Sequence, residues 1–138
     1  KYSRDQFGHG WADVDRDCQN TRQEVLISLS VSPVRFTDER KCRVTFGRWT
    51  SMYSGDVIFD ASIIDIDHIV PLKWAWDHGA DKWTKSKREK FANDPINLVA
   101  VEASLNRQKG AKGLDEWLPP TNQIQYKARF KRIWKMYK

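Results

Sequence analysis

The side chains best suited to catalysis lie in the second half of this sequence. Asp67 and His68 are adjacent within an apolar run, and the carboxamides Asn97 and Asn106 follow downstream. Carboxylate and carboxamide oxygens are hard ligands that Mg²⁺ accepts, and an imidazole beside them can act as a general base. Hydrolysis of a phosphodiester with one divalent ion needs both functions. We therefore interpret the chain as a metal-dependent nuclease that uses one Mg²⁺ ion, for which Mn²⁺ can substitute.

The run around His68 has the composition of a β-strand. Its β-branched residues predict an extended segment at residues 65–70. Successive side chains of a strand point to opposite faces, so Asp67 and His68 should diverge. Asp67 can then hold the ion from one side while His68 reaches the attacking water from another.

Two later segments can complete a hairpin and a helix. Residues 96–101 form a second short apolar run that can pair with the first. Residues 103–109 contain no helix breaker before Gly110, which suits the C-terminal cap of a helix. Asn106 falls on this helix and can face the hairpin.

Asp67-His68, Asn97 and Asn106 together resemble the His-Asn-Asn motif of the HNH endonucleases. The resemblance implies a ββα-metal site, in which a β-hairpin followed by a helix clasps one divalent ion. It implies that Asp67 and Asn106 are metal ligands, that His68 is the general base, and that Asn97 fixes the loop and the orientation of His68. Asp65 departs in part from the family, where other polar residues often occupy this position, and is expected only to support the ligands.

The resemblance covers roughly residues 11 to 120. Wider matches occur in segments 17–26, 74–80, 91–95 and 117–120. They are similar to a branch found in secreted bacterial nucleases and as the C-terminal domain of some modification-dependent restriction enzymes. The resemblance implies an α+β fold, a single HNH nuclease domain over residues 1–138, in which further helices and a short antiparallel sheet surround the hairpin and helix.

Patterns outside the motif predict those surrounding elements. Asp17 can cap a helix over residues 18–30, and a capping box beginning at Ser86 fits another short helix. Asn122 can cap a final helix with an apolar stripe and a basic face. The remaining expected elements are a strand at 43–53, a turn at 54–56, a returning strand at 57–59 and a helix at 72–78.

The charge of the chain favours an acidic polymer as its partner. The formal net charge is +6 and the isoelectric point is near 9.4, which favours nucleic acid phosphates. We expect Arg22, Arg107 and Lys109 to contact the substrate, with Arg22 gripping the scissile phosphate. No groove-reading helix is evident, so we expect backbone contacts to double-stranded DNA with little sequence specificity. No run is long enough to span a membrane, and no membrane partner is expected.

Cys18 and Cys42 are the two cysteines of the chain, and they lack the spacing of a structural zinc site. A disulfide between them is the better interpretation in an oxidising compartment, whereas two reduced thiols are expected in the cytosol. The missing initiator Met and signal peptide fit a mature secreted chain or a fragment. Resemblance to the secreted branch favours a secreted or periplasmic location.

Asp13, Asp15, Asp17 and Glu24 have the spacing of an EF-hand calcium loop. Cys18 occupies the position of the glycine that forms the sharp turn, and a non-glycine residue has a steric cost there. We therefore do not expect calcium binding at this segment.

Each motif residue also has a structural explanation when taken alone. An Asp-His pair on a strand is usually a surface ion pair or a core histidine. Asn97 alone could be a turn or cap residue, and segment 106–109 could be a solvated helix face. The order of the residues and the elements that carry them favour the nuclease. His9 and His78 lack such a context and are expected to be structural or surface residues. The alternatives are a catalytically inactive nucleic-acid-binding module, a structural secreted protein, and the nuclease domain of a toxin or restriction system.

Overall fold

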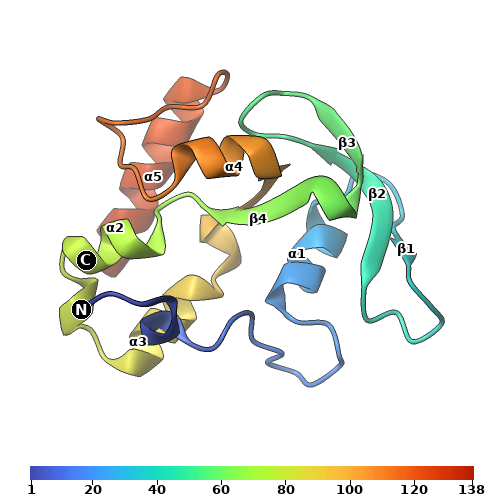
Figure 1. Ribbon diagram of the computed structural model, residues 1–138, viewed down its shortest axis with the longest axis horizontal. Helices are drawn as coiled ribbons and strands as arrows, with labels where there is room; N and C mark the ends of the chain where they lie inside the picture. The colour runs from blue at the N-terminus through green and yellow to red at the C-terminus, as the bar shows by residue number, and fades with distance from the viewer.

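A two-stranded antiparallel sheet carries the motif. The computed structural model describes all 138 residues, and β4 (Ile64–His68) and β5 (Leu98–Glu102) form this sheet (Figure 1). Their register places Ile64 opposite Glu102 and His68 opposite Leu98. A second antiparallel sheet and five helices surround it, so the predicted α+β fold is confirmed. The two strands are joined by a long connection that itself contains helices, rather than by a tight turn.

The side chains of β4 alternate between two faces. Ile64 and Ile66 are buried on one face, and His68 shares that face because it is two residues further along the strand. Asp65 and Asp67 point to the other face, where both contact the helix that follows β5. Asp67 and His68 therefore diverge as predicted.

A helix packs on each face of this sheet. Helix α4 (Ala103–Lys109) begins directly after β5 and covers the aspartate face of β4. It ends at Gly110, whose φ of 54° lies in the left-handed region that favours glycine. Helix α1 (Thr21–Leu29) packs its Val25 and Leu26 against the isoleucine face. Figure 1 shows α4 and α1 on opposite sides of β4.

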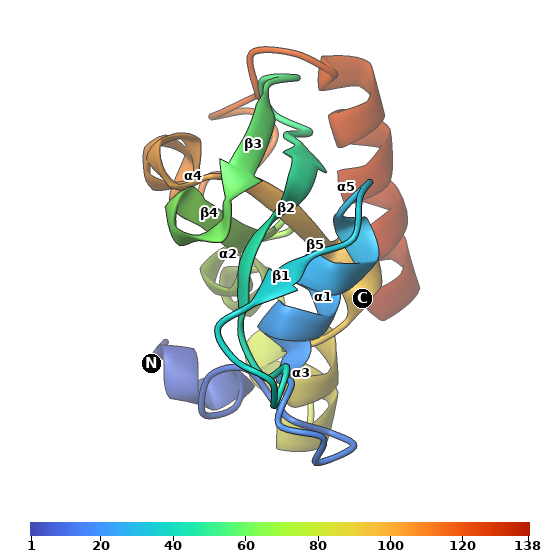
Figure 2. The same ribbon diagram turned by 90° about the vertical axis from the view of Figure 1, so that its right-hand side faces the viewer.

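The second sheet stands beside α1 and extends the same core. It contains β1 (Arg35–Phe36), β2 (Val44–Thr50) and β3 (Val57–Asp60) in that order, all antiparallel (Figure 2). Trp49 and Ile58 face each other across β2 and β3 and are buried with the isoleucines of β4. The Trp49 indole also donates a hydrogen bond of 2.8 Å to the Leu26 carbonyl, so this sheet is tied to α1.

An aromatic core occupies the other half of the molecule. It lies among α2 (Leu72–Asp77), α3 (Lys85–Ala92) and α5 (Gln123–Tyr137). The predicted apolar stripe of the last helix is confirmed, because Tyr126, Phe130, Ile133 and Tyr137 are all buried. Figure 2 shows α5 running along one side of the molecule.

Short 3₁₀ turns complete the chain at η1 (Arg4–Phe7), η2 (Ala61–Ile63), η3 (Ala80–Lys82) and η4 (Pro95–Asn97). None of the helices combines the length and apolar character needed to cross a bilayer.

Three helix caps differ from the sequence-based expectations. Asn20, not Asp17, caps α1 and accepts a hydrogen bond from the Gln23 amide. Thr84, not Ser86, caps α3. Asn122 precedes α5 in a left-handed conformation and makes no side-chain cap bond. Asp17 instead accepts from the Gln19 amide, because Asx side chains compete among several nearby backbone donors.

Cys18 and Cys42 form the expected disulfide, with their Cα atoms 5.2 Å apart. It joins the segment before α1 to the segment before β2. These segments are otherwise largely exposed, so the crosslink restrains a region that has little buried surface of its own.

Replacing both Cys18 and Cys42 with serine should lower the free energy of unfolding by about 3 kcal/mol, because the sequence separation of 24 residues closes a loop of substantial entropy. Urea unfolding of the oxidised wild type and the double variant measures this difference. Equal midpoints and slopes would show that the disulfide contributes nothing to stability.

Candidate functional site

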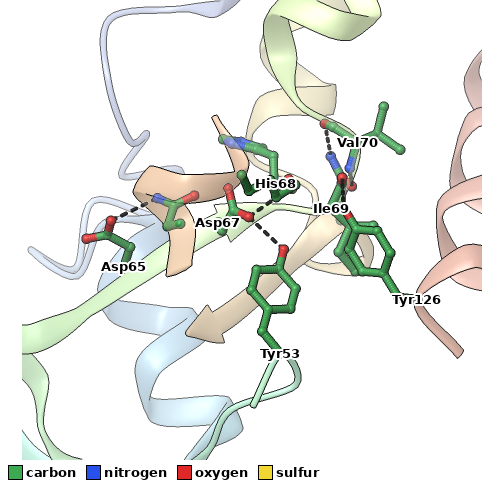
Figure 3. Close-up of polar contacts among 10 residues, drawn as sticks. Tyr53, Asp65, Asp67, His68, Ile69, Val70 and Tyr126 are labelled. Carbon is green, nitrogen blue, oxygen red and sulfur yellow. Dashed lines mark hydrogen bonds and ion pairs between the residues drawn. The ribbon is translucent and has the colours of Figure 1, made fainter. Parts of the chain in front are cut away.

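The loop after β4 is held on both sides by hydrogen bonds. The buried Asn97 side chain accepts from the Val70 amide at 2.8 Å and donates to the Val70 carbonyl at 3.1 Å. The Asn97 backbone carbonyl accepts from the Ile69 amide. The Tyr126 hydroxyl donates to the Ile69 carbonyl at 3.3 Å. Figure 3 shows Ile69, Val70 and Tyr126 immediately beyond His68. The bonds of Asn97 to Ile69 and Val70 therefore fix the direction in which the chain leaves β4.

The His68 imidazole is oriented by a backbone carbonyl and an aromatic ring. Its Nε2 lies 2.8 Å from the carbonyl oxygen of Ala92 at the end of α3. Because a carbonyl only accepts, Nε2 carries the proton, which leaves the Nδ1 lone pair available to accept another. The Trp11 ring stacks on the imidazole with centroids 5.3 Å apart. The geometry therefore fixes the tautomer that a general base needs.

Burial keeps this imidazole neutral. It lowers the pKa of His68 to about 4, although the hydrogen bond to Ala92 and the charge of Asp67 oppose that change. The ring is consequently unprotonated at neutral pH, with its Nδ1 lone pair free. No other group has to deprotonate His68 before it can accept a proton.

Asp67 is held by two side chains through a single oxygen. Its Oδ2 accepts from the Tyr53 hydroxyl at 2.6 Å and from the Lys109 ammonium at 2.7 Å (Figure 3). Burial, together with the charge of Asp67, raises the pKa of Tyr53 well above its usual value, so the phenol stays a donor. Both bonds fall on Oδ2, which leaves Oδ1 as the oxygen that can bind a ligand.

Lys109 does not have the role expected from the sequence. The expectation of a phosphate-contacting lysine is wrong, because its side chain is completely buried and its ammonium bonds Asp67 and the His68 carbonyl. Burial lowers the pKa of Lys109, and the adjacent Asp67 opposes that change. Lys109 thus ties the end of α4 to the end of β4.

Asn106 and Asp65 form a second contact between α4 and β4. The Asn106 amide nitrogen donates to Asp65 Oδ2 at 2.8 Å. This bond turns the nitrogen end of the carboxamide toward Asp65 and leaves its oxygen free. One carboxylate oxygen of Asp67 and one carboxamide oxygen of Asn106 therefore remain on the α4 face, and both are of the type that Mg²⁺ and Mn²⁺ accept.

The two expected arginine contacts lie in different places. Arg107 is exposed on α4 next to Asn106. Arg22 reaches the opposite end of β4 from His68, where its Nη2 donates to the carbonyls of Ala61 at 3.4 Å and Ile64 at 3.2 Å. His68 lies four residues after Ile64 along the strand, a span of about 13 Å. This position does not suit the expected grip of Arg22 on the scissile phosphate.

Sequence reasoning missed three groups that shape the site. Tyr53 was interpreted only as part of a strand before a turn, although it holds Asp67. Trp11 lies far from the motif in sequence and carried no signal for its stacking on His68. The Ala92 carbonyl could not have been found from residue type, because every residue has one.

The acidic segment before α1 forms a compact cluster. One oxygen from each of Asp13, Asp15 and Asp17 lies within 4.8 Å of the others. Burial and then the charges of these aspartates raise the pKa of Glu24. Cys18 adopts a φ of 72°, so the chain forms a sharp turn here despite the steric cost that a non-glycine residue has in this conformation. We assign no function to this cluster.

Comparison with known proteins identifies relatives of this site. Residues 20–133 match the family model for the C-terminal domain of GmrSD restriction endonucleases. A protein of Arthroderma benhamiae (strain ATCC MYA-4681 / CBS 112371), named "Uncharacterized secreted protein", is 41% identical over 135 residues. That match covers 96% of this chain and 63% of the fungal protein, so the chain spans less than two thirds of its relative. No solved structure matches the chain. The family match includes every candidate residue from Arg22 to Lys109 and excludes Trp11.

Replacing Lys109 with methionine should lower the free energy of unfolding by roughly 3–5 kcal/mol, because Asp67 then stays buried without its partner. A Lys109→Met/Asp67→Asn double variant should lose less than the sum of the two single losses. Chemical denaturation measures all three variants, with the exposed Lys112→Met as the control. Additive losses would contradict a coupled pair.

The imidazole of His68 should titrate near pH 4 in the metal-free protein, as followed by its ring proton shifts in NMR spectra. The unfolded chain binds this proton near pH 6.5. Between pH 6.5 and 4 the unfolded chain binds this proton and the folded chain does not, so the free energy of unfolding falls as the pH is lowered through this range. The contribution of His68 is fully present above pH 6.5, and up to about 3 kcal/mol is lost by pH 4. A His68→Gln variant should show a flatter decline in this window. A midpoint at or above 6.5 would contradict the lowered pKa of this half-buried ring.

Proposed function

This chain belongs to the family of the C-terminal domains of GmrSD restriction endonucleases, and from that membership we propose that it is a metal-dependent endonuclease with His68 as its general base. The observation that carries the proposal is the imidazole itself. It is held through Nε2 by the Ala92 carbonyl and is neutral at physiological pH because of its burial. Its Nδ1 is thereby poised to accept a proton.

The residues that would hold the ion are Asp67 and Asn106. Their free oxygens lie on the α4 face, and their partners Lys109, Tyr53 and Asp65 restrain them. A bound Mg²⁺ or Mn²⁺ would supply electrostatic stabilisation of the phosphate and of the departing oxygen. Restrained ligands favour binding because less side-chain freedom is lost when an ion binds.

The proton transfer uses groups at the end of β4. His68 Nδ1 takes a proton from water as the water oxygen bonds to phosphorus and the bond from phosphorus to the 3′ oxygen breaks. The 3′ oxygen leaves with the electron pair of that bond and takes a proton from solvent to become a hydroxyl. The product then carries a 5′ phosphate. The imidazolium that forms keeps its Nε2 hydrogen bond to Ala92, and the negative charge of Asp67 favours it. The ring therefore does not have to turn during the reaction.

The substrate is nucleic acid, with double-stranded DNA as the expected form. The family description supports a nucleic acid substrate, and the net charge of +6 favours phosphate binding. Arg107 is exposed beside Asn106 and is the side chain best placed to contact the backbone near the site. No recognition helix is presented, so we expect little sequence specificity.

A secreted location agrees with two findings. The disulfide between Cys18 and Cys42 is typical of oxidising compartments. The Arthroderma benhamiae relative carries a name that describes it as secreted. We therefore infer that this domain acts outside the reducing cytosol, in the extracellular space or the periplasm.

A catalytically inactive nucleic-acid-binding module is the second candidate. The observation that favours it is the Lys109 ammonium, which places a positive charge 2.7 Å from the carboxylate that would hold the ion. An ammonium beside a carboxylate weakens the attraction of that carboxylate for a metal. Activity of the purified chain distinguishes the two candidates.

Replacing His68 with alanine should lower the rate of plasmid hydrolysis by roughly 10²–10⁴-fold, the usual contribution of a general base, with DNA affinity nearly unchanged. His9→Ala is the matched control, because His9 is exposed and its nearest charged partner is Asp5. Initial rates of nicking in Mg²⁺ measure both variants. A His68→Ala variant that cuts as fast as the control would exclude His68 as the base.

A further inference from the structure

An open cavity of about 640 Å³ lies at the end of β4 away from His68. It is bordered by the start of α1, the start of β2 and the turn η2. The lining side chains that matter here are Arg22, Arg43, Thr45, Phe46, Asp60 and Ser62. The motif residues take no part in this cavity, so it is separate from the candidate catalytic site.

Two guanidinium groups share the cavity. Only Nη2 of Arg22 is used by the protein, on the carbonyls of Ala61 and Ile64, which leaves Nε and Nη1 free to donate. Arg43 is exposed beside it. Burial of Arg22 is the main cause of its lowered pKa, and the positive charge of Arg43 lowers that pKa further. An anion between the two groups would relieve this repulsion, and guanidinium groups bind phosphate with paired hydrogen bonds.

The negative groups near these arginines leave room for an anion. Asp60 lines the cavity, but its carboxylate accepts from the Ser62 amide and caps η2. Asp65 also acts on Arg22 and raises its pKa, while its Oδ2 is bonded to Asn106 on the other face of β4. Arg43 has no carboxylate partner within ion-pair distance.

Phe46 lines the same cavity. The residue is 49% exposed, and its ring stacks on no other aromatic side chain of the protein. It lies outside the buried core formed by its neighbours on β2. An exposed aromatic ring beside basic groups is the arrangement on which unpaired bases stack in proteins that bind single strands.

The edge of β4 connects this cavity to His68. The sheet has only two strands, so the outer edge of β4 is not paired with another strand. The Ile64 carbonyl bonds Arg22 and the His68 carbonyl bonds Lys109, which marks the two ends of that edge. They are separated by about 13 Å, so a phosphate in the cavity is not the phosphate attacked at His68.

We propose that this cavity is a subsite for a nucleotide that flanks the cleaved bond, with Arg22 and Arg43 on its phosphodiester and Phe46 stacked on its unpaired base. The proposal rests on the proposed nuclease function, since it names the form of the substrate. A base can stack on Phe46 only when it is unpaired, so the chain binds single-stranded or frayed nucleic acid better than intact duplex. This proposal therefore replaces the intact double-stranded DNA expected above with nucleic acid that is open beside the cleaved bond.

The test measures the affinity of a fluorescent 12-nucleotide single strand by anisotropy in a His68→Ala background. Phe46→Ala should weaken binding roughly 5- to 100-fold through loss of stacking. Phe59→Ala is its matched control, because Phe59 is 58% exposed on β3 and lies outside the cavity. Arg43→Ala should reduce the magnitude of the log-log slope of affinity against salt by about 0.7. Arg48→Ala is its matched control and should leave this slope unchanged, because Arg48 is exposed on β2 and lies outside the cavity.

The outcomes separate this subsite from the catalytic proposal. Losses confined to Phe46 and Arg43, with weaker binding of the matching duplex, support the subsite. The subsite is overturned if Phe46→Ala weakens binding no more than Phe59→Ala, or if Arg43→Ala changes the salt slope no more than Arg48→Ala. Tighter binding of duplex than of single strand also overturns it. A loss with Arg43→Ala alone also overturns it, because the stacked base is then absent. Losses confined to Phe46 and Arg43 in a chain that does not hydrolyse DNA would retain the subsite and reject the nuclease function.

Discussion

The buried ion pair between Asp67 and Lys109 is the interaction on which the site depends. It joins the last residues of β4 and α4, and the same ammonium holds the His68 carbonyl. Tyr53 adds a third segment to the same carboxylate oxygen. A buried pair gains little net stability, because its Coulomb attraction is offset by the cost of removing both charges from water. Its consequence here is geometric: it decides which oxygen of Asp67 remains available and where the strand that carries His68 ends.

The alternation of a β-strand then divides the chemistry between two faces. Asp67 faces α4, where Asn106 adds a second oxygen, while His68 faces Trp11 and the end of α3. The outer edge of β4 has no neighbouring strand, so a reacting phosphate that lies there can meet both faces. The same edge continues to Arg22 and Arg43. A nucleic acid strand that follows the edge would therefore contact the catalytic residues and the flanking cavity in turn.

Much of this arrangement could be predicted from local patterns. The β-branched run around Asp67 predicted the strand and the divergence of its polar side chains, and Gly110 predicted where α4 ends. The disulfide was also predicted. The role of Lys109 was not, because a lysine beside Arg107 near a helix end has the pattern of a solvated face. Only tertiary packing brings Asp67 and Tyr53 to it. The caps were mispredicted for a related reason, since Asp17, Asn20 and nearby hydroxyls compete for the same few amides.

We propose that this chain hydrolyses phosphodiesters with a divalent ion bound at β4 and α4. The most direct test is to incubate purified wild-type chain with supercoiled plasmid in Mg²⁺, in Mn²⁺ and in EDTA, and to follow nicked and linear products on a gel. We expect cleavage with either ion, no cleavage in EDTA, and recovery of cleavage when excess Mg²⁺ is restored. Cleavage that persists unchanged in EDTA would contradict the metal, and a plasmid left intact with both ions would contradict the nuclease.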